Sequence, residues 1–77
     1  MVMLERQQVK AQGIINEVYD ERDDDIVPVF RFDKGVLIVR FDKEAIIYSS
    51  CLTNLAKAGF MPSVFLNDGD IILAVYD

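Results

Sequence analysis

The chain has 77 residues, of which 52% are hydrophobic, and its 8 basic and 13 acidic residues give a net charge of −5. This length allows one small domain, spanning residues 1–77, and the acidic charge disfavours direct binding to nucleic-acid phosphates. Because the chain has no histidine and only one cysteine, histidine-assisted nucleophilic catalysis, the common zinc-ligand sets and an internal disulfide are excluded. We expect a protein that is not an enzyme and that uses no metal and no cofactor.

Charged residues also bear on location. Glu5, Arg6 and Lys10 interrupt the N-terminal region before any apolar stretch reaches the length of a signal-peptide core, and no segment approaches the length of a membrane span. We expect a cytoplasmic protein with no membrane partner. A chain this short buries only about 60% of the surface that it exposes when unfolded, so its surplus apolar surface predicts a partner. A second copy is the simplest such partner.

The first predicted element is an amphipathic helix over residues 2–22. Its apolar stripe consists of Leu4, Ala11, Ile15 and Val18. Gly13 is a poor helix former, so residues 13–19 are also compatible with a strand. The acidic run at 23–25 is unfavourable at the negative end of the helix dipole, and it therefore predicts the helix end and a solvated turn.

A β-hairpin is predicted next, with strands at residues 26–33 and 36–42 joined by Lys34-Gly35. The two-residue turn fixes a register in which one face is apolar and the other is mixed. The apolar face pairs Phe32 with Leu37, Phe30 with Val39 and Pro28 with Phe41, and the mixed face pairs Arg31 with Ile38 and Val29 with Arg40. Since Pro28 has no N–H, the first strand is either an edge strand or begins at that residue.

A second helix is predicted from Asp42, its N-cap, to Ala58. Gly59 is placed as the left-handed residue that follows the helix, and Phe60 would then pack on Leu55, as in a Schellman ending. Residues 45–50 leave an alternative, because their β-branched side chains favour an extended segment before a shorter helix.

The last predicted element is a second hairpin, in which residues 63–67 and 70–76 flank the turn Asp68-Gly69. Its register places apolar side chains on both faces. One face carries Val64, Leu66, Ile71 and Leu73, and the other carries Phe65, Ile72, Ala74 and Tyr76. A hairpin at the protein surface alternates apolar with polar residues, so this one belongs inside a layered structure or at an interface.

The element order α-β-β-α-β-β predicts an α+β fold, in which two hairpins form one antiparallel four-stranded sheet and two helices lie across it. Each half is a helix followed by a hairpin, although no residue-level repeat is evident. Two arrangements remain open: one helix covers each face of the sheet, or one face stays uncovered in the monomer. The small size and compact order would suit an accessory protein of a phage or mobile element.

The favoured function is a small acidic protein-protein interaction module, an adaptor or inhibitor of another protein, that also forms homo-oligomers, with a dimer expected. Its interface is expected on apolar strand residues turned away from the main core, namely Val29, Phe65, Ile72 and Tyr76. The alternative is an inhibitor that mimics nucleic acid, since a groove lined by arginine or lysine accepts carboxylates much as it accepts phosphates. The carboxylates on one side of the first helix are Glu17, Asp20, Glu21 and Asp24.

Three smaller features complete the candidates. Arg31 and Arg40, as diagonal neighbours on the mixed hairpin face, are a possible anion contact at a subunit interface, although pairing with Asp or Glu is the simpler role. Cys51 lies among apolar residues with no neighbouring base in the sequence, which indicates core packing. The acidic run at 20–25 lacks the glycine and glutamate positions of a calcium-binding loop and indicates a solvated turn.

Overall fold

The computed structural model describes residues 3–23, 25–41 and 45–77. The elements are α1 (Glu5–Arg22), β1 (Val29–Asp33), β2 (Val36–Phe41), α2 (Ser49–Lys57), β3 (Met61–Asn67) and β4 (Asp70–Tyr76). Two hairpins form one antiparallel four-stranded sheet in the order β1-β2-β4-β3, which confirms the predicted α+β fold. β1 and β3 are the two edge strands.

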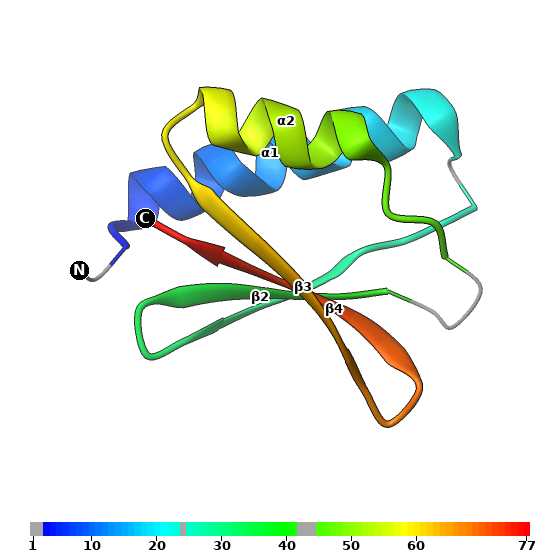
Figure 1. The fold of residues 1–77 in the computed structure, drawn as a ribbon. Coiled ribbons are helices and arrows are strands. Elements are labelled where there is room, and N and C mark those ends of the chain that lie inside the picture. Colours follow the sequence, from blue (N-terminus) through cyan, green and yellow to red (C-terminus); the bar gives the residue numbers. More distant parts are fainter. Residues whose placement is uncertain (1–2, 24, 42–44) are drawn as a thin grey trace.

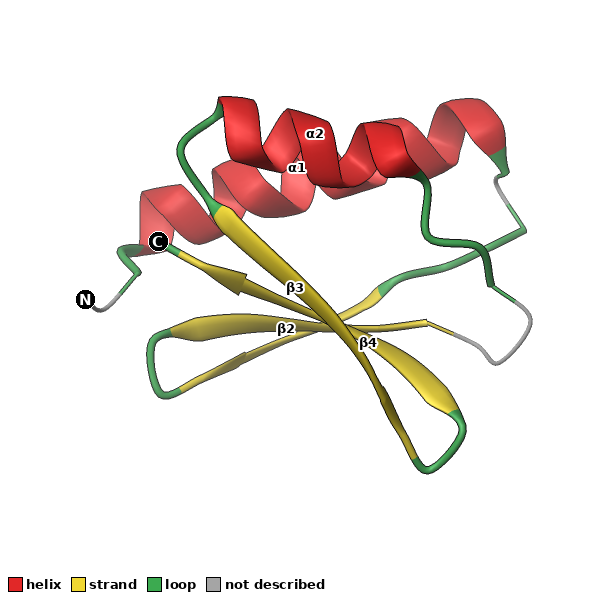
Figure 2. Ribbon diagram, viewed as in Figure 1, coloured by secondary structure: helices red, strands yellow, loops and turns green. Residues whose placement is uncertain are grey.

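Both helices cover the same face of the sheet (Figure 1, Figure 2). The main core lies between this face and the helices, where Ile15 and Leu55 pack with Val39 and Leu73. The arrangement with one helix on each face is therefore wrong. We call the other side the open face. Strand alternation assigns to it Val29, Arg31, Asp33, Val36, Ile38, Arg40, Met61, Ser63, Phe65, Asn67, Asp70, Ile72, Ala74 and Tyr76.

The first helix extends without interruption through residues 13–19, so the strand alternative for that segment is excluded. Its buried residues are Ala11, Ile15, Val18 and Tyr19. Leu4, predicted as part of this stripe, is 53% exposed instead, because it is the extended N-cap residue and its side chain does not follow the helical repeat. The helix ends at Arg22 with Asp23 as C-cap, as the acidic run predicts, and Asp24 lies outside the described residues.

Both hairpin turns have positive φ at their two central residues, as type I′ turns require: 52° and 82° at Lys34-Gly35, and 52° and 84° at Asp68-Gly69. The predicted register of both hairpins is confirmed, except that Pro28 and Phe41 do not pair because Pro28 precedes β1. β1 begins at Val29, immediately after Pro28, and not at residue 26. β3, in contrast, begins two residues earlier than predicted, at Met61.

The second helix begins at Ser49 and not near Asp42, which together with residues 43–44 lies outside the described residues. Residues 45–48 are neither helix nor strand. The Tyr19 hydroxyl donates a hydrogen bond of 2.7 Å to the Ile46 carbonyl oxygen, and its ring centroid lies 5.4 Å from that of Tyr48. These contacts with α1 compete with helix formation in the segment before Ser49.

The end of α2 has the predicted Schellman geometry. Gly59 has φ +95°, and its N–H donates to the Ala56 carbonyl at 3.1 Å. The N–H of Phe60 donates to the carbonyl oxygen of Leu55 at 3.0 Å, and both side chains are buried. The local signal in the sequence therefore located this helix end correctly.

The two hairpins are structurally equivalent. Pro28, Asp33 and Gly35 of the first occupy the positions that Pro62, Asn67 and Gly69 occupy in the second, and the order β1-β2-β4-β3 is symmetric under their exchange. Their charged residues are not equivalent, because the positions of Arg31 and Arg40 hold Phe65 and Ala74 in the second hairpin. The sheet thus has an approximate internal symmetry that its charges break.

Candidate functional site

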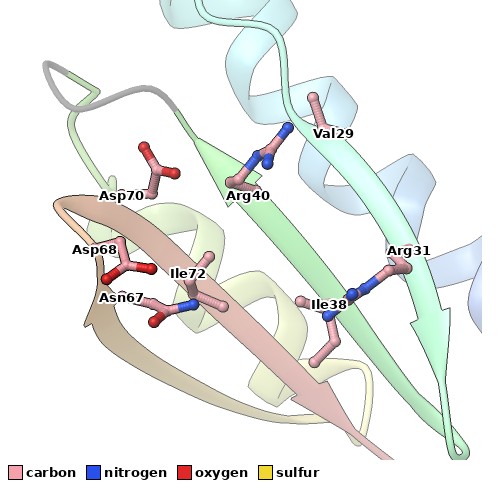
Figure 3. A pocket seen from close by; sticks show the side chains of 8 residues that line it. All are labelled: Val29, Arg31, Ile38, Arg40, Asn67, Asp68, Asp70 and Ile72. Carbon is pink, nitrogen blue, oxygen red and sulfur yellow. The ribbon is translucent and has the colours of Figure 1, made fainter.

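A cleft of about 330 Å³ opens on the open face of the sheet (Figure 3). It is lined by residues of β1, β2 and β4 and by the end of β3 with its turn: Val29, Arg31, Ile38, Arg40, Asn67, Asp68, Asp70 and Ile72. A cavity of this size is at the small end of the range for ligand sites. β1 and β2 contribute Val29, Arg31, Ile38 and Arg40. All of them except Ile38 were predicted from the sequence as interface or anion-contact residues.

The cleft has two walls of opposite character. Arg31 and Arg40 stand on the side of the first hairpin, while Asn67, Asp68 and Asp70 stand on the side of the second (Figure 3). We call these the basic wall and the acidic wall. Arg31 is paired with Ile38 and Arg40 with Val29, so the two arginines are diagonal neighbours on one face, as predicted.

The floor of the cleft is apolar. It consists of Ile38 and Ile72 on the central strands β2 and β4, whereas Val29 stands at the outer edge of the cleft on β1 (Figure 3). Ile72 is only 6% exposed although no described helix covers this face. β4 is a central strand, with Phe65 and Arg40 directly across from Ile72 on either side. The twist of the sheet folds these neighbours around it.

No protein-family model, curated protein or solved structure matches the chain.

The arginines of the basic wall are not accounted for by internal pairing in the described part of the chain. The side-chain hydrogen bonds there involve Gln7, Tyr19 and Asp23, and none reaches Arg31 or Arg40. A guanidinium group beside an apolar floor is suited to bind carboxylate or phosphate oxygens, because it presents a fixed fork of N–H donors. That these two arginines contact an anion stays a prediction.

The four predicted interface residues all lie on the open face, at different depths. Val29, Phe65 and Tyr76 are exposed, whereas Ile72 belongs to the cleft floor. Met61 is a further exposed apolar residue of this face that sequence reasoning missed. The missing signal was the early start of β3, since Met61 pairs with Tyr76 only if the strand extends that far.

The acidic side of α1 is separate from the cleft. Glu17, Asp20 and Glu21 are exposed on this helix, and Asp24 lies outside the described residues. A row of three carboxylates is also the ordinary composition of a solvated helix face, so it does not favour nucleic-acid mimicry over that role.

Two buried groups complete the chemistry of the core. Burial raises the pKa of the Cys51 thiol to about 11, so this side chain is a protonated core residue near neutral pH. Burial is also the main cause that raises the pKa of the Tyr19 hydroxyl to about 12. Within residues 3–23, 25–41 and 45–77, no cluster of three or more metal-ligating side chains occurs, and no helix is long and apolar enough to cross a membrane.

Proposed function

We propose that this protein is a non-catalytic, cytoplasmic interaction module that docks protein surfaces through its open face and forms a homodimer there. It would serve as an adaptor or inhibitor of another protein. One observation carries this proposal: both helices pack on the same side of the sheet, so large apolar side chains of the other side stay exposed. These side chains are Val29, Met61, Phe65 and Tyr76.

The size of the open face sets the expected strength of association. Four strands about 4.8 Å apart, each with about six residues at ~3.3 Å, span an area of roughly 400 Å². A standard stable interface buries about 800 Å² per partner, so the open face provides about half of that area. A small interface favours a weak dimer, so we expect a mass that depends on protein concentration.

Phe65 is the best position to test the open face. Its side chain is 47% exposed and points away from the helices, so a folded monomer should tolerate glutamate there. Ile72 is a poor probe, since a charge at its nearly buried position would destabilise the monomer itself. Leu66 is a matched control, because it is the next residue of β3, is 75% exposed and points to the helix side.

The experiment is a measurement of molar mass by light scattering, over concentrations from low to high micromolar, for wild type, Phe65→Glu and Leu66→Glu. We expect the wild-type mass to rise towards that of a dimer, Phe65→Glu to remain a monomer, and Leu66→Glu to behave as wild type. A wild-type protein that stays monomeric at high micromolar concentration would refute the proposal. If both variants fail to dimerise, we would place the interface at the edge of β3 and not on the open face.

A further inference from the structure

The charges on the open face point to a specific arrangement of the partner. We infer that two copies of this chain dock face to face about a two-fold axis, so that Arg31 and Arg40 of each copy meet Asp68 and Asp70 of the other. This inference rests on the proposed function and deepens it, because it names the residues that determine how the open faces align.

The two hairpins contribute opposite charges to the cleft. The basic wall belongs to the first hairpin and the acidic wall to the second, and the register of β2 with β4 makes Arg40 and Asp70 diagonal neighbours (Figure 3). The face therefore carries both members of a charge pair, although neither arginine is hydrogen-bonded within the described residues. A second copy is the one partner that necessarily presents the same two walls at the same spacing.

A two-fold axis would pair the basic wall and the acidic wall reciprocally. In a two-fold interface, when a residue i of one copy contacts a residue j of its partner, the reverse contact also forms. A rotation axis that lies in the interface, between the two walls, brings the basic wall over the acidic wall twice. Rotation about an axis perpendicular to that one leaves arginine facing arginine, and this like-charge contact costs free energy. The charges thus select one alignment of the two faces.

The depth of the cleft suits an arginine side chain of a second copy. The floor of the cleft lies below its rim, so two flat apolar faces would leave a void between them. An arginine is long enough to extend into the cleft of the opposite copy, with its aliphatic part along Ile38 or Ile72 and its guanidinium at the acidic wall. These opposite-charge contacts also offset the repulsion between two chains that each carry a net charge of −5.

Reciprocal charge reversal tests this alignment. Arg40→Glu and Asp70→Arg each place like charges opposite one another in both halves of a dimer, whereas an equimolar mixture of the two variants restores both opposite-charge contacts. Asp70 is preferred to Asp68, because Asp68 has φ 52° and a substitution there also changes how readily the residue adopts the left-handed conformation of the turn. Circular dichroism and thermal unfolding establish that each variant is folded, and Arg31→Glu replaces Arg40→Glu if that variant is not.

We expect the dissociation constant of each variant alone to rise roughly tenfold or more above that of wild type. We expect the mixture to form a heterodimer at wild-type concentrations, as detected by native mass spectrometry. Variants that dimerise as wild type does, or folded variants that do not recover on mixing, would overturn the charge pairing. The proposed function would still stand in those cases if Phe65→Glu abolishes the dimer. Stabilisation of a monomeric wild type by inorganic phosphate, lost in Arg40→Glu, would instead assign the arginines to a free anion.

Discussion

Two glycines are expected to respond in opposite directions to the same substitution by alanine. Gly13 lies inside α1, whereas Gly59 follows α2 with φ +95°. A methyl group at either position would meet no heavy atom within 4 Å beyond the adjacent chain. Clashes with neighbouring residues are thus absent in both cases, and the backbone conformation alone decides the sign of the effect.

The magnitudes follow from these conformations. In a helix interior glycine is about 1 kcal/mol less favourable than alanine, so Gly13→Ala should raise the free energy of unfolding by about 1 kcal/mol. A left-handed conformation costs a residue with a Cβ roughly 1–2 kcal/mol, so Gly59→Ala should lower the free energy of unfolding by about that amount. For a domain of this size 1 kcal/mol corresponds to a change in Tm of about 4–8 °C.

The assay is urea denaturation followed by circular dichroism, together with thermal unfolding, at one fixed protein concentration because dimer formation adds to apparent stability. The two sites lie on different helices with open space around each, so the double variant should show the sum of the two effects. A destabilising Gly13→Ala would refute the helical, uncovered environment of this residue. A neutral Gly59→Ala would refute the left-handed ending of α2.

Two further predictions concern the core. Tyr19→Phe should lower the free energy of unfolding by about 1 kcal/mol in urea denaturation, because it removes the hydrogen bond to the Ile46 carbonyl but keeps the ring contacts with Phe41 and Tyr48; an unchanged stability would contradict this role. The thiol of Cys51, with its pKa raised to about 11, ionises first in the unfolded state, where the pKa is about 8.5. Stability should therefore fall as pH rises from about 8.5 towards 11, and Cys51→Ala should show a shallower fall over that interval, so an equal slope in the two proteins would exclude the thiol as its source.

The elements that could be predicted from the sequence are those set by local backbone chemistry. Lys34-Gly35, Asp68-Gly69 and Gly59 all require positive φ at positions where glycine or a turn-forming residue stands. Two-residue turns then fix the register of each hairpin, and the register fixes which side chains share a face. The register alone therefore predicts that Arg31 and Arg40 are diagonal neighbours on one face of the sheet.

The start of α2 could not be predicted in the same way. Ile46 and Tyr48, in the segment before Ser49, are held by contacts with Tyr19. Tyr19 is far from this segment in the sequence, so local patterns do not show these contacts. The position of the helices was equally undetermined, because the second hairpin is apolar on both faces and local patterning does not distinguish the face that receives a helix. The acidic wall was missed for a related reason: Asn67, Asp68 and Asp70 were interpreted only as turn residues.

Two apolar residues of β4 that face away from the helices are buried within the monomer, so they do not by themselves predict an interface. Ile72 and Ala74 are buried on the open face, at 6% and 1% exposure, by their neighbours across the twisted sheet. Their apolar character is therefore satisfied within the monomer and does not require a partner. The proposed partner would instead cover the rim, where Val29 and Phe65 on the edge strands stay exposed around a cleft with arginines on one side and carboxylates on the other. In the proposed dimer, a second copy of this face covers the apolar rim and supplies an anion to one wall and a cation to the other.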